Sequence, residues 1–376
     1  MTSSLRILHC MRAPVGGLFR HVLDLAAEQA RRGHDVGVIA DSTASDLLTT
    51  ARFTALEPHL KLGLRLTPMS RQPGLGDLSS ARAVARHAAA IKANVLHGHG
   101  AKGGAYARLG GRLLTGQGNR IATFYTPHGG TLNYKPGSLE GRVYLKLEKV
   151  LSRWTSGLIF ESDYARRIYD QRIGIGHVPA RVVPNGLSPS DFTPHAPNAD
   201  VADLLFIGEL RELKGIDVLL DAIKAISETR PIRAVIVGSG PDGDTLKQQA
   251  QRLRLSELVS FPGAMPAAKA FPLGRLLVVP SRAESFPYIV LEAGAAGIPL
   301  VATAVGGIPE ITGDTGFNLV PAGDAVGLIA AILDAIDNPA DTAARTQRLN
   351  ARVGKLFTVA AMTTSIEDFY RSALTA

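Results

Sequence analysis

The densest group of potentially reactive side chains lies in the segment "VVPSRAESFPYIVLEAGAAG", residues 278–297. It contains two carboxylates, Glu284 and Glu292, around a helix start signalled by Ser285 and Pro287. A carboxylate among small and apolar residues needs a partner, because burial of an unpaired charge is costly. Sugar hydroxyls are suitable donors, and a buried structural ion pair is the alternative.

A second candidate group is cationic and lies in "GELRELKG", residues 208–215. Arg211 and Lys214 fall where a helix is predicted to begin, although the helix dipole favours anions there. A bound diphosphate would remove this conflict. Two solvated surface cations are the other interpretation.

Two glycine-rich turns could bring a ligand close to the backbone. Gly16 and Gly17 follow the first predicted strand and open its helix, where phosphate is favoured, although a tight turn explains them equally well. Gly238 lies in a similar turn, "VGSGPDGD". Asp242 and Asp244 in that turn resemble a metal-binding Asp-x-Asp, but both residue types are also favoured at helix starts, which is the interpretation we prefer.

Three histidines follow predicted strands. His97 and His99 lie in "VLHGHG", and no cysteine or carboxylate nearby in the sequence completes a metal site around them. We therefore expect no metal site. His128 in "TPHGG" could donate a hydrogen bond to a sugar hydroxyl or assist proton transfer, with a packed loop histidine as the alternative.

The elements that must position these residues alternate between strand and helix, which predicts parallel sheets covered by helices. The pattern stops at the Pro-, Asn- and Ser-rich stretch 184–200 and then restarts. We predict an α/β protein with two doubly wound Rossmann-like domains. Ligands of such sheets bind beyond the carboxyl ends of the strands, and two such domains would face a central cleft.

Composition and charge restrict the remaining possibilities. The lone cysteine, Cys10, cannot form an internal disulfide, and we expect it to be a small apolar strand residue. Residues 1–195 carry 25 Lys and Arg against 13 Asp and Glu, or +12; the remainder carries 16 against 20, or −4, and the sum is the overall +8. The first half is therefore expected to meet an anionic partner.

The identity of that anionic partner can be narrowed. The basic residues lack interleaved aromatics, so we expect no nucleic acid partner. The helical segment 142–154, "RVYLKLEKVLSRW", mixes basic and apolar residues and could lie on anionic lipid, although a helix with a solvated basic face is equally compatible. No signal peptide or spanning segment is apparent. We expect a cytoplasmic protein, either free or peripheral on the inner face of the membrane.

The combination of motifs resembles the large family of retaining glycosyltransferases with the GT-B fold (family 4, group 1), which includes bacterial polysaccharide and mannosyl transferases. The resemblance covers almost the whole chain, and its most specific part is Glu284 and Glu292 within "PSRAESFPYIVLEA". Six shorter motifs fall in the expected order: "GG" at 16–17, "HGHG" at 97–100, "TPHG" at 126–129, "PNG" at 184–186, "KG" at 214–215 and "VGSGP" at 237–241.

The resemblance implies roles for individual residues. Glu284 matches the glutamate that contacts the donor sugar, and Glu292 matches the one that contacts the ribose. Lys214 matches the diphosphate-binding lysine, and His128 matches the histidine beside the donor sugar. These matches predict that His128, Lys214 and Glu284 are catalytic. The predicted donor-binding residues are Gly16, Gly17, Arg211, Lys214, Gly238, Glu284, Ser285, Phe286 and Glu292.

This sequence departs from the family pattern at two positions. Glu209 stands where the family often has a diphosphate-binding arginine, and Arg211 is the candidate replacement. Pro287 stands where the family often has glycine and supplies no backbone N–H.

The resemblance also predicts the organisation and activity of the chain. It implies an acceptor-side domain at 1–195, a nucleotide-sugar-binding domain at 196–355 and a helix at 356–376 that crosses back to the first domain. We expect retaining hexosyl transfer from a UDP or GDP sugar to a sugar or lipid-linked acceptor, in bacterial polysaccharide or glycolipid biosynthesis, without cofactor or metal. The alternative is a non-catalytic nucleotide-sugar-binding protein.

Overall fold

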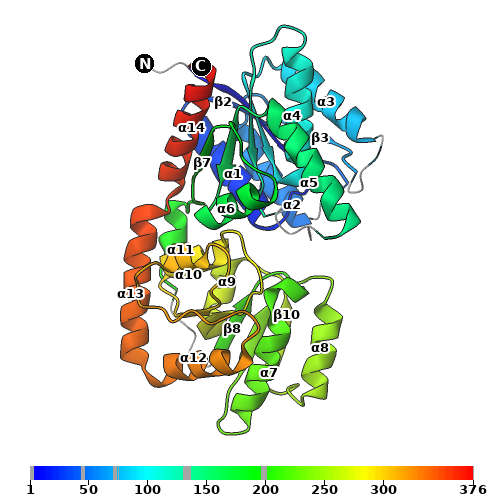
Figure 1. The fold of residues 1–376 in the computed structure, drawn as a ribbon. Helices are drawn as coiled ribbons and strands as arrows, with labels where there is room; N and C mark the ends of the chain where they lie inside the picture. Colours follow the sequence, from blue (N-terminus) through cyan, green and yellow to red (C-terminus); the bar gives the residue numbers. More distant parts are fainter. Residues whose placement is uncertain are drawn as a thin grey trace. The chain divides into compact units, whose positions relative to one another are not determined.

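The computed structural model describes residues 4–43, 47–70, 74, 76–129, 137–195 and 201–375. The chain divides into two compact units, one made of Met1–Gly186 and Val359–Ala376 and the other of Leu187–Thr358. Each unit is a parallel sheet with helices on both faces (Figure 1). The change of unit falls at residue 187, nine residues before the predicted start of the second domain at residue 196, because Leu187 and Phe192 already pack in the core of the second unit.

The first unit contains seven parallel strands in the order β3-β2-β1-β4-β5-β6-β7. The strands are β1 (Arg6–Met11), β2 (Asp35–Asp41), β3 (Leu64–Thr67), β4 (Val95–His99), β5 (Ala122–Thr126), β6 (Gly157–Phe160) and β7 (Ala180–Val182). The helices are α1 (Gly16–Arg31), α2 (Leu47–Leu56), α3 (Gly76–Ala90), α4 (Gly100–Thr115), α5 (Leu139–Leu151), α6 (Asp163–Arg172) and α14 (Val359–Thr375).

Alternation along the strands divides the first unit's core between two faces. Leu8, Cys10 and Leu96 point to one face and pack with α3 and α4. Cys10 is completely buried, and burial raises the pKa of its thiol to about 12. It is therefore an unreactive core residue. Ile7 and Val95 point to the opposite face, which α14 covers.

The second unit has five parallel strands in the order β10-β9-β8-β11-β12. They are β8 (Ala202–Ile207), β9 (Ala234–Val237), β10 (Val259–Gly263), β11 (Gly274–Val279) and β12 (Leu300–Ala302). The helices are α7 (Ile216–Ser227), α8 (Gly243–Arg252), α9 (Ala267–Ala270), α10 (Tyr288–Ala296), α11 (Ile308–Thr312), α12 (Ala325–Asp337) and α13 (Pro339–Leu356). One face packs with α7, α8 and α12, and the other with α10, α11 and α13.

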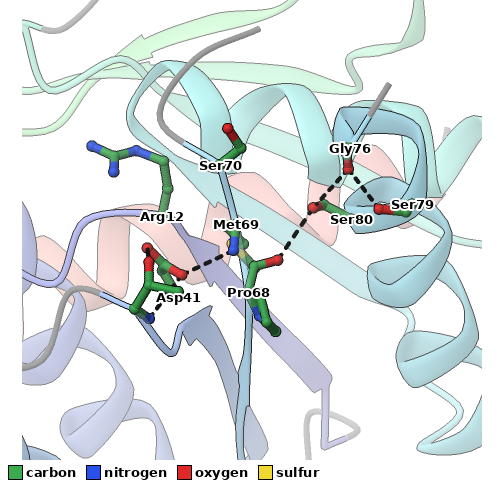
Figure 2. Close-up of a pocket in the computed structure, with 9 residues that line it drawn as sticks. Arg12, Asp41, Pro68, Met69, Ser70, Gly76, Ser79 and Ser80 are labelled. Atoms are coloured by element: carbon green, nitrogen blue, oxygen red, sulfur yellow. Dashed lines mark hydrogen bonds between the residues drawn. The ribbon is translucent and has the colours of Figure 1, made fainter. Parts of the chain in front are cut away.

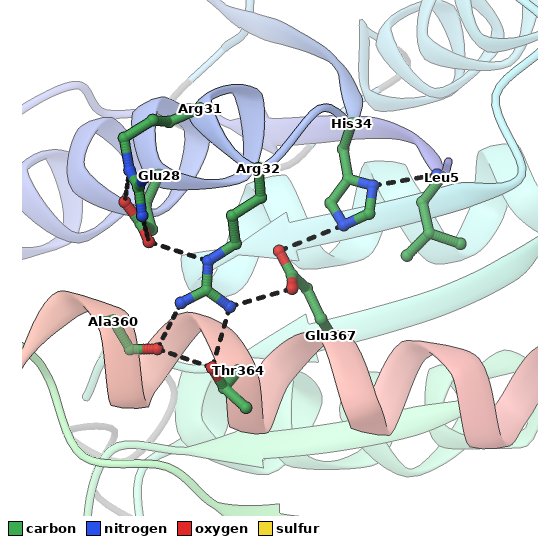
Figure 3. Close-up of polar contacts among 8 residues, drawn as sticks. All are labelled: Leu5, Glu28, Arg31, Arg32, His34, Ala360, Thr364 and Glu367. Carbon is green, nitrogen blue, oxygen red and sulfur yellow. Dashed lines mark hydrogen bonds and ion pairs between the residues drawn. The ribbon is translucent and has the colours of Figure 1, made fainter. Parts of the chain in front are cut away.

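The C-terminal helix α14 belongs to the first unit, although it follows the second unit in sequence. Its apolar residues pack on the strand face that contains Ile7 and Val95. Arg32, at the end of α1, ties the two helices together (Figure 3). Its guanidinium donates to the Ala360 carbonyl at 2.7 Å, to Thr364 Oγ1 at 2.9 Å and to Glu367 Oε2 at 3.1 Å.

Among the described residues, no helix combines the length and the apolar composition that crossing a bilayer requires.

Candidate active site

Adjacent strands bring Lys214 and Glu284 together in the second unit. β8 and β11 are parallel neighbours, and each of the two residues follows one of these strands. Because parallel strands end at the same edge of a sheet, residues 70 positions apart in sequence meet there. Lys214 Nζ donates to Glu284 Oε1 at 2.7 Å, and Ser281 Oγ donates to the same oxygen at 2.7 Å. These contacts hold the carboxylate in one orientation.

Three glycines allow the backbone segments at this edge to approach one another closely. Gly215 (φ +67°) separates Lys214 from α7, and a Cβ there would lie 2.0 Å from the Pro280 carbonyl oxygen. A Cβ on Gly306 would lie 1.9 Å from the Glu284 carbonyl oxygen, and one on Gly238 would lie 1.8 Å from that of Gly208. Side chains would therefore force these loops apart and displace Lys214 and Glu284.

The other predicted donor residues differ in exposure. The Arg211 side chain is 46% exposed, and Nη1 lies 3.4 Å from Glu209 Oε2, so its position leaves it available to a ligand. Glu292 lies within α10 and is only partly buried, which corrects the expectation of a buried carboxylate. Phe286 is 4% exposed and packs edge-on against Phe357, so it supports the loop from inside the core.

The start of α10 supplies backbone donors at the same edge. The helix begins at Tyr288, and its N-cap residue, Pro287, provides no side-chain hydrogen bond. N–H groups at a helix start favour an anion. The Ser285 carbonyl accepts from the Gly307 N–H at 2.7 Å, which fixes the loop before the helix.

Gly16 and Gly17 lie at the start of α1 in the first unit, and both are exposed. Val15 precedes them as the N-cap residue and provides no side-chain hydrogen bond. Gly16 has φ +60°, and a Cβ there would meet no atom within 4 Å. The turn is therefore open and its backbone is available to an anionic ligand.

His128 follows β5 at the carboxyl edge of the first unit's sheet, but its ring points inward. The side chain is 4% exposed. Nδ1 lies 2.6 Å from Glu161 Oε1, and Nε2 lies 3.0 Å from Nδ1 of His99. Both ring nitrogens are engaged within the unit, so the ring is not free to donate to a sugar as sequence analysis suggests.

Behind His128 lies a buried histidine cluster, formed by His9, His21, His97, His99 and His128. The register of β1 against β4 pairs His9 with His97, and alternation places His99 on the same face. His9, His21 and Glu161 are not among the residues predicted from the sequence. The available signal was a histidine within each of two apolar strands that the Rossmann-like order makes neighbours.

Two groups within this cluster have the composition of a metal site among the residues that the structure describes. They are His9, His97 and His99, and His21, His99 and His128, with ligand atoms in each group within 4.8 Å of one another. His97 and His99 have no cysteine or carboxylate close by in the sequence, but the fold brings other histidines to them. However, His97 is bonded to Tyr370 and Thr126 through its two nitrogens, so the contacts are those of a hydrogen-bonded network.

A pocket of about 380 Å³ opens at the carboxyl ends of β1, β2 and β3 (Figure 2). Asp41 lies in it and accepts hydrogen bonds from Thr43 and from the Met69 N–H, which joins the ends of two strands. Arg12 contributes a guanidinium, and Ser70, Ser79 and Ser80 contribute hydroxyls to the lining. The lining therefore combines a cationic group, a carboxylate and hydroxyls with apolar surface.

Two protein families match successive parts of the chain. The family described as "Glycosyltransferase Family 4" matches residues 15–191, and "Glycosyl transferases group 1" matches residues 202–338. Glycogen synthase of Mycobacterium tuberculosis is 27% identical over 395 residues, covering 96% of this chain and 92% of that protein. D-inositol 3-phosphate glycosyltransferase of Streptomyces avermitilis is 35% identical over 187 residues, 46% of this chain and 40% of that protein.

Solved structures match the whole fold. Sucrose-phosphate synthase from Thermosynechococcus elongatus superposes with a TM-score of 0.81 at 21% identity, covering 98% of this chain and 99% of that one. Anabaena HepE in complex with UDP-glucose has a TM-score of 0.81 at 22% identity, with coverage of 98% and 100%. These matches confirm the GT-B fold with two Rossmann-like domains.

The fold and the two family matches thus define a nucleotide-sugar-dependent transferase of the GT-B class. The chain belongs to the family 4, group 1 glycosyltransferases, a retaining family that transfers hexosyl groups. This confirms the prediction that the protein is an enzyme.

Proposed function

We propose that the second unit binds the diphosphate of a UDP or GDP sugar at Lys214, with Glu284 contacting the sugar and Glu292 the ribose. The observation that carries this proposal is the contact of 2.7 Å between Lys214 and Glu284 at the carboxyl edge of β8 and β11. A cation beside a held carboxylate provides one group for a phosphate and one for sugar hydroxyls. Arg211 and the start of α10 are further donors for the diphosphate.

The reaction we propose retains the anomeric configuration by attack from the leaving-group side. The acceptor oxygen forms a bond to the anomeric carbon while the bond from that carbon to the diphosphate oxygen breaks. The departing diphosphate oxygen takes the acceptor's proton. Lys214 stabilises the negative charge that develops on the diphosphate, which is the main catalytic requirement of this scheme.

The acceptor belongs to the first unit in this proposal. Its pocket combines the Arg12 guanidinium with the Asp41 carboxylate and several serine hydroxyls. Hydroxyl groups of a sugar can pair with all of these, and an anionic group on the acceptor can pair with Arg12. A hydroxylated acceptor, phosphorylated or lipid-linked, therefore fits the pocket and its unit's positive charge.

A two-stage experiment tests the donor proposal. Purified protein is first screened for thermal stabilisation by UDP and GDP sugars, starting with UDP-glucose, since binding to the folded state raises apparent stability. The stabilising donor is then used in a transfer assay, and the anomer of the product is determined. Stabilisation without turnover would contradict the proposed transfer to the acceptors tested. An inverted anomer, or a glycosyl ester trapped on a carboxylate, would contradict same-face attack.

Peripheral binding to anionic membranes is a second proposal, and α5 carries it. Val143, Leu147 and Val150 are exposed by 58%, 46% and 43%, and their spacing places them on one stripe of the helix. Exposed Arg142, Lys146, Lys149 and Arg153 form an adjacent basic stripe. Apolar and basic stripes side by side are typical of helices that lie in a membrane interface.

The orientation of α5 is fixed from the inside. Glu148 on its buried side accepts two hydrogen bonds from Arg108, at 2.8 and 3.0 Å, and both side chains are buried. The Arg108 guanidinium also lies 3.9 Å from the centre of the Tyr125 ring. This anchor keeps the apolar stripe directed outward, so the helix is preorganised for a surface.

Sedimentation with anionic phosphatidylglycerol vesicles tests the membrane proposal. Binding is expected at low salt and should fall strongly in the double variant Lys146→Glu/Lys149→Glu and in Leu147→Ser. The control Arg166→Glu/Arg167→Glu makes the same charge change on exposed residues of α6. No binding by the wild type, or an equal loss in the control, would refute a role for α5 and favour a soluble anionic acceptor.

A further inference from the structure

The buried histidines of the first unit form a continuous hydrogen-bonded chain with an acceptor at each end. Glu161 Oε1 is 2.6 Å from His128 Nδ1, and His128 Nε2 is 3.0 Å from His99 Nδ1. His99 Nε2 is 3.0 Å from His9 Nδ1, and His9 Nε2 is 2.8 Å from Gln29 Oε1. This hydrogen-bonded chain of side chains therefore joins the end of β6 to α1 through three imidazole rings.

Counting protons along this chain gives its charge. It has four contacts, and each needs one proton between its two heavy atoms. Neither terminal oxygen contributes one, because a carboxylate and an amide carbonyl only accept. Three neutral imidazoles carry three protons, so the fourth contact requires one ring to be an imidazolium. The positive charge of that ring balances the negative charge of Glu161.

Geometry places the extra proton on the ring that contacts the carboxylate: His128 Nδ1 lies 2.6 Å from Glu161 Oε1, and a carboxylate at that distance favours an imidazolium. Burial lowers the pKa of His9 to about 4, although its hydrogen bond to Gln29 opposes this effect. Burial and the neighbouring histidines hold the pKa of His99 well below its usual range. His128 and Glu161 thus form the charged pair, and His9 and His99 stay neutral.

The other groups around His128 agree with this arrangement. The ring centre of His21 lies 4.8 Å from that of His128, and His21 Nδ1 is bonded to Asn185 Oδ1 at 2.9 Å. Burial, together with the charge of His128, lowers the pKa of His21 to about 3, so this ring is neutral. His97 lies beside the chain, with its nitrogens bonded to Tyr370 and Thr126.

Holding the His128 ring also holds its backbone. His128 has φ +50° and is followed by Gly129 with φ +73°. The left-handed conformation is unfavourable for a residue with a side chain, and it persists when the surroundings fix it. The two ring hydrogen bonds provide that restraint at the carboxyl edge of β5.

We propose that Glu161 and Gln29 are positioning residues that set the protonation state of this chain and so keep His128 as an imidazolium in its left-handed turn. Glu161 acts directly on His128, and Gln29 acts through His9 and His99. The consequence for catalysis rests on the proposed glycosyl transfer, but the protonation pattern does not.

Nitrogen NMR at neutral pH, on protein with ¹⁵N-labelled histidine, tests the proposed protonation states of the three rings without any substrate. In the wild type, His128 should show two protonated nitrogens, and His9 and His99 should both carry the proton on Nε2. If the Gln29 amide were reversed, its NH₂ would donate to His9, both tautomers would be Nδ1–H and His128 would be neutral. That result in the wild type would overturn the proposal.

Gln29→Met gives the sharper test because it leaves His128 and Glu161 untouched. Without the acceptor at position 29, three protons satisfy the remaining three contacts. His9 and His99 should then switch to the Nδ1–H tautomer, and His128 should become neutral. A packing role alone would not reverse tautomers two rings away. Unchanged tautomers in folded Gln29→Met would refute the proposal.

Glu161→Gln and a matched control complete the experiment. Glu161→Gln removes the balancing charge and allows an amide N–H at position 161 to donate to His128 Nδ1, so His128 should be neutral. Thr126→Val removes a hydroxyl bonded to His97 in the same buried cluster but off the chain, and His128 should stay doubly protonated. Turnover with the identified donor should fall roughly 10- to 100-fold in Gln29→Met and in Glu161→Gln, as when a group near the reacting centre is misplaced. It should stay within about twofold in Thr126→Val. Altered tautomers with normal turnover would refute the catalytic part alone.

Discussion

Replacing Lys214 with alanine should separate catalysis from stability. Its side chain is 24% exposed and its ion pair with Glu284 is 2.7 Å long. A partly exposed pair contributes at most about 1 kcal/mol to the free energy of unfolding. In the transition state, the same ammonium group would face charge developing on the diphosphate, where one preorganised donor contributes about 3–4 kcal/mol. At about 1.4 kcal/mol per decade, Lys214→Ala should lower kcat roughly 100- to 1000-fold.

The assay compares kcat with stability in two lysine variants. Lys224 is a matched control because it lies in the same unit, is 37% exposed and pairs with Glu228 at 3.1 Å. Steady-state transfer is measured with the donor found in the stabilisation screen, and urea unfolding is measured on the same preparations. Lys224→Ala should change neither quantity appreciably. A kcat in Lys214→Ala within about threefold of the wild type would refute the reasoning, because about 0.7 kcal/mol cannot represent a principal charge contact. A loss of turnover in Lys214→Ala that unfolding of the variant fully explains would also refute the reasoning.

Three further predictions concern other parts of the molecule. EDTA should leave turnover unchanged if Lys214 and the helix starts neutralise the diphosphate; near-complete loss that Mg²⁺ or Mn²⁺ restores would contradict this. Glu292→Gln should weaken nucleotide binding about 10-fold in calorimetry, because a charged hydrogen bond to ribose contributes about 1.5–3 kcal/mol, and a loss confined to kcat would argue against ribose contact. Arg32→Ala should lower the free energy of unfolding by about 2–3 kcal/mol in urea titrations, since Arg32 bonds three groups on α14. Arg31→Ala is the control and should have almost no effect, because the Arg31 side chain is 71% exposed and pairs with neighbouring Glu28. Equal losses of stability in the two variants would show that the contacts of Arg32 with α14 are unimportant.

The meeting of Lys214 and Glu284 was predictable because its signals are local. A strand followed by Lys214, and another followed by Glu284, need only the rule that parallel strands end at one edge. The strand order makes β8 and β11 neighbours, and the contact follows. The detailed contacts of these side chains were harder to predict from the sequence. Whether Glu292 was buried depended on how α10 packs, and the contact of Ser281 with Glu284 had no separate signature.

The first unit's polar interior was not predictable in the same way. His9, His97 and His128 are separated by up to 119 positions, and each is surrounded by apolar or small residues in its own segment. Their association requires the order β1-β4-β5, the register of His9 against His97 and the cover provided by α14. Glu161 gave no signal either, because a carboxylate at a strand end normally indicates solvent rather than a buried partner.

The position of α14 links this interior to the end of the chain. Tyr370 Oη lies 2.5 Å from His97 Nδ1, and Arg32 binds the first turns of the same helix. A cluster of five histidines needs protection from water if its hydrogen bonds are to remain ordered, because water would offer each ring alternative partners. The helix that closes the first unit is therefore also what keeps its histidines in a low-dielectric environment. The turn at His128 thus depends on residues 359–375 as well as on its own strand, although neither segment predicts the other from sequence alone.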